Sequence, residues 1–477
     1  MKAKRAGDYV WDIPKTGGMR VPGRIYASES MIGRIERERV AEQVANVACL
    51  PGIVGASLAM PDCHWGYGAP VGGVAATDER VGVVSPGLVG YDISCGMRVL
   101  RTGLLAAAVR PKAEALMDAL HATVTSGVGR GGGLRLEPRE LEGLLEGGAG
   151  WAVKRGLGEA ADLDVLEDAG TFPGADPGRV SSRALERGRD QLGTLGSGNH
   201  FLELQAVDEV FDEKAAEAFG LFPGQFVVMV HTGSRGLGYQ VCTDALKLMP
   251  AAMKRANISL PDRQLACAPL DSREGKDYLS AMAAAANFAR GNRQAITHKV
   301  RAACREALGL SAADLGMSVL YDVSHNLAKY ERHAVDGVER RLCVHRKGAT
   351  RAFPAGHADV PEAYRAVGQP VLVPGTMGTS SYVLVGTPRA MLETFGSVCH
   401  GAGRVMSRTE AARRVRPEEL RRRLKDLGIT ARTDSWKGFA EEAPEAYKDV
   451  SEVVEVCEAA GLSRRVAKLK PFGVLKG

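Results

Sequence analysis

The sequence predicts a mixed α+β fold, with stacked mixed β-sheets surrounded by helices and a metal- and nucleotide-binding cleft at the strand ends. Apolar segments typical of buried strands, at 225–230 and 317–323, each run directly into a polar turn that begins with or contains a histidine. A long alanine-rich stretch over 272–308 is typical of a helix. Because ligands often bind where central strands meet glycine-rich loops, we expect these polar turns to face one cleft.

Composition limits the class of protein. The chain has 477 residues, a net charge of +6 and 58 glycines. The charge suits an anionic partner such as RNA or DNA, although many basic proteins bind no nucleic acid. Nine cysteines without a CxxC pair indicate reduced thiols and a cytoplasmic location. No apolar run approaches membrane-spanning length, so we expect no membrane partner.

The N-terminal part is predicted to hold a helix and then a polar loop. Residues 35–48 place Val40, Val44 and Val47 on one apolar helical face. A glycine-rich loop over 60–68 follows, in which Asp62 and His64 can share a cleft. A purely structural turn explains the glycine-rich segment 60–68 equally well.

A carboxylate and a thiol stand three residues apart in the turn 90–96, after a short predicted strand at 81–87. The Cys95 thiolate can bridge two divalent cations, and Asp92 can supply a hard oxygen ligand. Taken alone, the pair also fits a buried free cysteine. Beyond it, helices over 110–126 and 137–150 and a connector at 127–133 give the region 105–185 the character of a peripheral insertion.

Histidines recur at predicted strand ends. Each one alone fits a core or rim residue, but together with Asp92 and Cys95 they favour a metal centre. The histidine-bearing segments are Asn199-His200 before an alternating strand in which Phe201 and Glu203 share a face, His231 before a glycine-rich loop with Arg235, His325-Asn326, and His345. In the long helix, we expect a break near Gly291 and exposed or capping roles for Asn287, Asn292 and Arg293.

The C-terminal part adds a second set of polar turns. A hydroxyl-rich turn separates two strands between 371 and 382, and small residues follow His400, which lets a nucleotide approach the backbone. Arg404 can hold phosphate, whereas the arginine-rich run at 413–425 fits a solvated helix face better than an RNA contact. The terminal strand would hold Lys476 in a fixed place.

Carboxylate, thiolate and imidazole ligands suit Mn²⁺ or Zn²⁺, and two such ions can orient a triphosphate. No Walker A run is present, so a P-loop ATPase is not indicated. A neutral His400 imidazole can attack an α-phosphate, but residue spacing does not choose between this nucleotidyl transfer and hydrolysis by a dinuclear phosphoesterase. A non-catalytic RNA-binding protein is a third reading of the basic charge.

The motifs together are similar to those of the RtcB family of RNA-splicing and repair ligases. The resemblance spans nearly the whole chain, from residue 60 to the terminal LKG. It is carried by MPDCHWGYG at 60–68, SPGLVGYDISCG at 85–96, LGSGNHFLE at 195–203, HTGSRGLG at 231–238, DVSHN at 322–326, HRKGATRAF at 345–353, PGTMGTSSY at 374–382 and CHGAGR at 399–404.

The resemblance implies two Mn²⁺ ions bridged by Cys95, with Asp92 and His200 at one ion and His231 and His325 at the other. It implies that His400 is the guanylylated nucleophile. The GTP pocket that it implies contains Asn199, His200, Phe201, Glu203, His325, Asn326, Ser381, His400, Ala402, Gly403, Tyr447 and Lys476, with Thr376 where the family pattern favours serine; Asp62, His64, Arg235 and Arg404 are further active-site candidates.

The reaction implied joins an RNA 3′-phosphate or 2′,3′-cyclic phosphate end to a 5′-hydroxyl end, through a histidine–GMP adduct and an RNA-(3′)pp(5′)G end. The resemblance favours one catalytic domain over 1–477, working as a monomer, with archease as a candidate activating partner. Whether the RNA is a tRNA being spliced or a broken RNA being repaired is left open.

Overall fold

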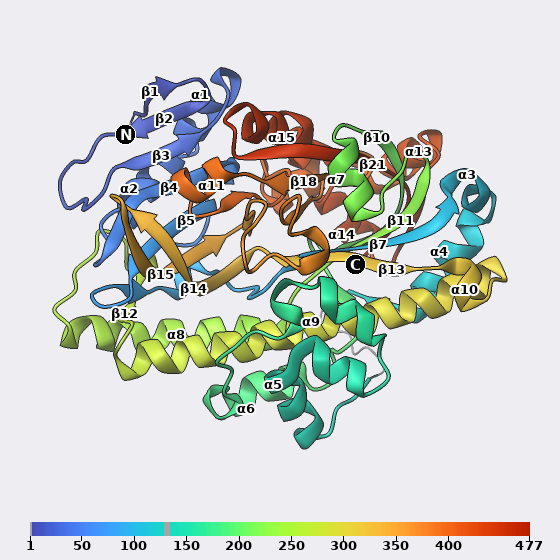
Figure 1. Ribbon diagram of the computed structural model, residues 1–477, viewed down its shortest axis with the longest axis horizontal. Coiled ribbons are helices and arrows are strands. Elements are labelled where there is room, and N and C mark those ends of the chain that lie inside the picture. Colours follow the sequence, from blue (N-terminus) through green and yellow to red (C-terminus); the bar gives the residue numbers. More distant parts are fainter. Residues whose placement is uncertain (1, 128–133) are drawn as a thin grey trace.

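Two sheets form the centre of the computed structural model, which describes residues 2–127 and 134–477 (Figure 1). In both sheets neighbouring strands are antiparallel, except for the pairs β3–β4 and β20–β21. The first sheet has the order β1 (Lys4–Gly7), β2 (Val10–Ile13), β3 (Gly23–Tyr26), β4 (Ile53–His64), β5 (Val71–Asp78), β15 (Val338–Lys347), β14 (Asn326–Val335). The second has the order β13 (Ser318–Ser324), β7 (Gly96–Leu105), β11 (Gln225–Thr232), β10 (Phe201–Val210), β21 (Ser463–Lys476), β18 (Ser381–Gly386), β17 (Pro370–Val373), with β20 (Thr430–Thr433) beside β21.

Helices cover these sheets, which confirms the predicted mixed α+β fold. Helices α8 (Arg235–Arg255) and α9 (Arg273–Leu308) run side by side beneath both sheets, and α5 (Pro138–Lys154) and α6 (Ser182–Gly188) lie below them (Figure 1). None of the helices in the described residues combines the length and the apolar character that crossing a bilayer requires.

The remaining elements are short. The other helices are α1 (Glu29–Arg37), α2 (Val40–Val47), α3 (Ala106–Val109), α4 (Ala113–Thr123), α7 (Glu213–Phe219), α10 (Ala312–Leu315), α11 (Pro388–Glu393), α12 (Arg408–Arg414), α13 (Pro417–Asp426), α14 (Trp436–Glu441) and α15 (Val450–Ala459). Two-stranded pairs join β6 (Val83–Val84) to β12 (Ala268–Pro269), β8 (Thr125–Ser126) to β9 (Thr194–Gly196), and β16 (Ala349–Arg351) to β19 (Ser397–Cys399).

Two element boundaries differ from the sequence prediction. The expected helix over 35–48 is divided between α1 and α2, because Arg39 adopts a left-handed φ of 61° between them. Val40, Val44 and Val47 are nevertheless buried, as their spacing predicts. The first residues of the expected loop at 60–68 are the end of strand β4, which therefore delivers Asp62 and His64 from a sheet.

The predicted break in the long helix is absent. Helix α9 is capped at its start by Ser272, whose Oγ accepts the Gly275 N–H. It continues through Gly291 to Leu308 and is followed by a left-handed Gly309. A Cβ atom on Gly291 would lie 2.2 Å from Leu144 Cδ1 of α5. Gly291 therefore allows two helices to pack closely rather than ending one.

The region 105–185 contains α3, α4 and α5, and α5 packs along α9. Residues 128–133 of the expected connector lie outside the described residues. The region also reaches the centre of the molecule, since Glu167 Oε2 accepts the backbone N–H of Ser324. Its assignment as a peripheral insertion stays a prediction.

Candidate metal and nucleotide site

Five neighbouring strands of the second sheet bring the candidate metal donors to one end of that sheet. Because these strands are antiparallel, the starts of β7 and β10 lie beside the ends of β13, β11 and β21. Gly96 pairs with Thr232 and Ser324, and Phe201 pairs with both His231 and Lys476. Segments far apart in the sequence therefore present their polar residues in one row.

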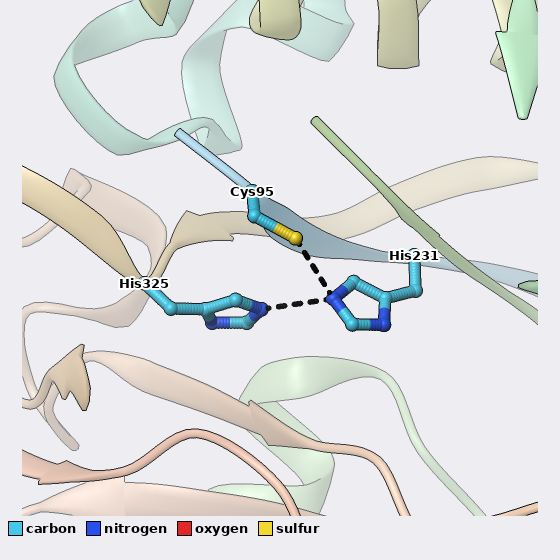
Figure 2. Close-up of side chains that lie close together, drawn as sticks. All are labelled: Cys95, His231 and His325. Carbon is cyan, nitrogen blue, oxygen red and sulfur yellow. Dashed lines mark hydrogen bonds between the residues drawn. The ribbon is translucent and has the colours of Figure 1, made fainter. Parts of the chain in front are cut away.

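The Cys95 thiol lies at the middle of this row. Its Sγ is 3.1 Å from His231 Nε2 and 3.4 Å from His200 Nε2. Figure 2 shows Cys95, His231 and His325 pointing toward one another, with 3.4 Å between the two Nε2 atoms. His200 Nε2 is also 2.8 Å from Asp92 Oδ2.

These donors form two groups that share Cys95. One is Asp92, Cys95 and His200, the other is Cys95, His231 and His325, and within each group the ligand atoms all lie within 4.8 Å of one another. A carboxylate, a thiolate and imidazoles match the preferences of divalent cations such as Mn²⁺ and Zn²⁺. The donor set therefore fits two ions that share one sulfur ligand.

The imidazoles are held by their other ring nitrogens. His231 Nδ1 lies 3.1 Å from the Asn199 carbonyl oxygen, and His325 Nδ1 lies 3.3 Å from Thr350 Oγ1. Arg235 Nη1 lies 3.4 Å from His200 Nδ1. With each Nδ1 engaged, each Nε2 faces the centre of the donor row, which is the usual arrangement around a bound metal.

Burial sets the charge of these groups. It lowers the pKa of His231 and His325 well below the ordinary value, and the neighbouring histidines add to the effect. It raises the pKa of the Cys95 thiol well above the ordinary value, and the Asp92 carboxylate adds to this. The His231 and His325 imidazoles are therefore neutral and able to bind a metal, whereas the Cys95 thiol needs a cation nearby in order to ionise.

Helix α9 fixes the backbone of the donor turns from behind. Arg293 donates to the carbonyl oxygens of Ser94 at 2.8 Å and Thr232 at 3.0 Å, and it forms a bidentate pair with Asp322 at 2.7 and 2.8 Å. Asn292 accepts the N–H groups of Gly193 and Thr194, and Asn287 accepts that of Phe172. The prediction of exposed or capping roles for Asn287, Asn292 and Arg293 is wrong: all three are fully buried and satisfy backbone groups of other segments.

The donor turns are also bonded directly to each other. Ser94, at a left-handed φ of 54°, donates its N–H to the Asn326 carbonyl at 2.8 Å, and His325 donates its N–H to the Cys95 carbonyl at 2.8 Å. A non-glycine residue in this conformation is uncommon, and it persists where surrounding contacts enforce it. The two donor turns therefore form one backbone unit.

His400 lies beside the donor row and is oriented by Asp62. Its Nδ1 is 2.6 Å from Asp62 Oδ2, which also accepts the backbone N–H groups of His400 and Gly401. Burial alone would raise the pKa of Asp62, but the His400 ring, the His400 backbone N–H and the Lys448 cation bring it below its ordinary value. The His400 and His325 ring centres are 5.2 Å apart, and Nε2 of His400 is left for a substrate.

A cavity of about 300 Å³ lies over the donors and His400. Five candidate residues stand behind its wall rather than on it: Asp62, His200, Glu203, Arg235 and Ser381. Gln205 donates to both Glu203 Oε2 and Ser381 Oγ, so these two lie together beneath the cavity. The candidate residues that line the cavity are His64, Asp92, Cys95, Asn199, Phe201, His231, His325, Asn326, Thr376, His400, Ala402, Gly403, Arg404, Tyr447 and Lys476.

Comparison with known proteins identifies the family. A family model described as tRNA-splicing ligase RtcB matches residues 43–477. The chain belongs to this family. The tRNA-splicing ligase RtcB of Archaeoglobus fulgidus is 55% identical over 476 residues, which cover 99% of this chain and 98% of that protein. The corresponding protein of Thermococcus kodakarensis is 54% identical over 475 residues, 99% and 98% of the two chains.

A bacterial relative extends the comparison. The RNA-splicing ligase RtcB of Mycobacterium tuberculosis is 55% identical over 438 residues, which cover 91% of this chain and all of that protein. The resemblance to the RtcB family and the expectation of a ligase-family enzyme are thereby confirmed.

The family model begins at residue 43, after β1–β3 and α1. The N-terminal part of the first sheet therefore lies outside the matched region.

Several cavity residues of this RtcB family member were not identified from the sequence. Glu442 accepts Arg404 at 2.6 Å and Arg408 at 2.7 Å, and it also contacts the Tyr447 hydroxyl. Arg408 starts α12 and lies before the arginine-rich run at 413–425, and no sequence pattern singles out Glu442. Lys347, also on the wall, donates to the carbonyl oxygens of Tyr67, Ala69 and Gly87.

One candidate histidine lies elsewhere. His345 is fully buried inside β15, and its Nε2 accepts the Ser85 N–H at 3.4 Å. It belongs to neither donor group and does not line the cavity. The core-residue reading of that histidine fits its surroundings.

Proposed function

We propose that this chain is a GTP- and Mn²⁺-dependent RNA ligase that joins a 3′-phosphate or 2′,3′-cyclic phosphate end to a 5′-hydroxyl end, in tRNA splicing or RNA repair. The names of its relatives support RNA ligation in tRNA splicing. One observation carries the chemistry: Cys95 Sγ belongs to both donor groups, while the His400 ring lies 5.2 Å from that of His325.

Asp92, Cys95 and His200 would hold one Mn²⁺, and Cys95, His231 and His325 the other. Bound cations at these positions would offset the negative charge of phosphate groups entering the cavity and orient them. The wall of the cavity supplies further recognition, since Lys476, Arg404, Phe201 and Tyr447 would border the bound GTP.

The Asp62 carboxylate holds the proton on His400 Nδ1, so the lone pair of Nε2 is available for attack. Nε2 forms a bond to the α-phosphorus of GTP as the bond to pyrophosphate breaks. An oxygen of the RNA 3′-phosphate then takes GMP from the histidine, which breaks the N–P bond and gives RNA-(3′)pp(5′)G. Finally the 5′-hydroxyl attacks the RNA 3′-phosphorus and GMP leaves; water opens a cyclic end beforehand.

Incubation with α-labelled GTP and Mn²⁺ tests this proposal. The wild-type chain should form an acid-labile labelled adduct, and His400→Ala should form none. Asp62→Asn should label at least about tenfold more slowly, because Nδ1 then faces a neutral amide oxygen in place of a carboxylate. His121→Ala is the control, since His121 lies on α4, pairs with Asp434 and does not line the cavity. Equal labelling of wild type and His400→Ala would refute the nucleophile, and steady phosphate release without an adduct would favour a dinuclear phosphoesterase.

The cytoplasmic location, the monomeric state and activation by a partner such as archease belong to the same proposal. All nine cysteines are free thiols, which suits a reducing compartment. Gel filtration coupled to light scattering would test the monomer, and ligation rates with and without archease would test the partner.

A further inference from the structure

The exposed tryptophan and tyrosine side chains are gathered at one place. In the described residues, the Trp and Tyr residues with at least 36% of their surface exposed are Trp65 (47%), Tyr67 (37%) and Tyr239 (48%). Tyr67 and Tyr239 both contact the ring of Tyr91, which lines the cavity. We call Trp65, Tyr67, Tyr91 and Tyr239 the aromatic rim.

The aromatic rim runs from the candidate metal donors to the surface. Tyr91 immediately precedes Asp92, and its ring stacks on Tyr239 with 4.8 Å between ring centres and an interplanar angle of 25°. The Tyr67 ring meets Tyr91 edge-on at 5.5 Å. Trp65 stands two residues before Tyr67 and directly after His64, which also lines the cavity.

Guanidinium groups accompany the exposed rings. Arg187 lies over the Tyr239 ring at 5.2 Å from its centre, and Arg39 lies over Trp65 at 5.7 Å. Exposed aromatic rings beside cations match the chemistry of unpaired nucleotides, whose bases stack on rings while arginines hold the phosphates. A double-stranded segment keeps its bases stacked inside the helix and gains little from such a surface.

We propose that the aromatic rim binds the unpaired nucleobases next to the RNA ends that enter the cavity. This inference rests on the proposed function and adds a subsite to it. When the neighbouring bases are held on Tyr239 and Trp65, the terminal phosphate or hydroxyl group of the RNA can reach the donors at Asp92 and Cys95. The enzyme therefore requires single-stranded nucleotides at the join.

Binding of a short fluorescein-labelled single-stranded RNA, measured by anisotropy with Mn²⁺ and without GTP, tests the proposal. Tyr239→Ala should raise the Kd about 5- to 100-fold, because one stacked base is lost, whereas Tyr239→Phe keeps the ring and should bind nearly as wild type does. The matched control is Phe222→Ala, which removes an exposed ring (37%) outside the rim and should leave the Kd unchanged.

An RNA whose end nucleotides lack bases gives a second arm. Wild type should bind this abasic RNA as weakly as Tyr239→Ala binds intact RNA. The Tyr239→Ala substitution should cause no further loss of affinity for the abasic RNA. Intact RNA should also quench the fluorescence of Trp65, and the quenching should be lost in Trp65→Phe. Unchanged affinity in Tyr239→Ala, or equal binding of intact and abasic RNA, would overturn the proposal.

The failure of this proposal is distinguishable from failure of the proposed function. Labelling of wild type by GTP needs no RNA, and binding of RNA needs no GTP. Base-dependent binding without labelling would count against the ligase chemistry alone. Labelling together with base-independent binding would count against the aromatic rim alone.

Discussion

Cys95 serves more of the candidate centre than any other single side chain, because its sulfur lies in both donor groups. Replacement by serine removes a ligand from two ions, whereas Asp92→Ala leaves the group of Cys95, His231 and His325 complete. We therefore expect Cys95→Ser to lose both bound Mn²⁺ ions and Asp92→Ala to keep about one. Metal content after gel filtration measures this.

The control for the cysteine substitution is Cys49→Ser, a part-exposed thiol outside both donor groups, which should keep the wild-type metal content. Equal metal loss in Cys95→Ser and Asp92→Ala would argue against a shared sulfur ligand.

Glu203 should give the protein a pH-dependent stability of known sign. Burial raises its pKa from 4.5 to about 8, although Gln205 and Lys476 act in the opposite direction. The unfolded chain has the ordinary pKa, so the folded protein holds an extra proton between these values. The stabilising contribution is complete below pH 4.5 and is lost as the pH rises through about 8.

A glutamine at position 203 cannot titrate. The difference in unfolding free energy between wild type and Glu203→Gln should therefore change by up to about 5 kcal/mol over this range. Wild type should lose stability relative to the variant as pH rises. Urea unfolding at acidic, neutral and alkaline pH in metal- and GTP-free buffer measures the difference, and parallel pH profiles would contradict it.

At the scale of elements, α9 acts as the support of the donor turns, and Arg293 is its central contact. Arg293→Lys removes the planar fork that reaches two carbonyl oxygens and Asp322 at once. We expect the affinity for metal to fall about 10- to 100-fold, as for other residues that position ligands. Titration with Co²⁺, followed by the thiolate-to-cobalt absorption, measures it.

Arg98→Lys provides a matched control for this substitution. Arg98 is equally buried and binds the same Asp322, but its other contacts are Gln294 and Thr297 rather than donor turns. Both variants should lose stability, yet only Arg293→Lys should lose metal affinity. Equal affinities in the two variants would mean that Arg293 contributes to folding alone.

The same helix shows what the sequence can and cannot predict. Apolar runs that end in histidine-containing turns identified the strand ends at His231 and His325, because the apolar run and the turn residues that follow it are neighbours in the sequence. The order in which those strands pair is a long-range property, and no local pattern contains it. Asn292 and Arg293 look like interruptions of an apolar helix until the carbonyl groups that they satisfy are known. Buried polar positions of this kind depend on partners distant in sequence.

At the scale of the whole molecule, the candidate nucleophile and the metal donors are held by different sheets. Asp62, which orients His400, belongs to β4 of the first sheet, whereas Cys95, His200 and His231 lie at strand ends of the second. Helix α9 packs against strands of both sheets, including β14 and β11. The distance between His400 and the donors therefore depends on how the two sheets are fixed together.

Metal binding should consequently stabilise the whole fold. The donors come from four separate segments, so the centre exists only when the strands are paired, and an ion binds the folded chain in preference to the unfolded one. At one hundred times the Kd, each ion adds about 2.7 kcal/mol. With an unfolding entropy of roughly 1 kcal/mol/K for a chain of this length, two ions should raise the Tm by roughly 5 °C.

Calorimetry with and without Mn²⁺ measures this shift, and a chelator should reverse it. In Cys95→Ser the shift should be largely absent, because the substitution removes the sulfur that both ions share. A Tm increase of the same size in that variant would place the stabilising ions elsewhere on the molecule.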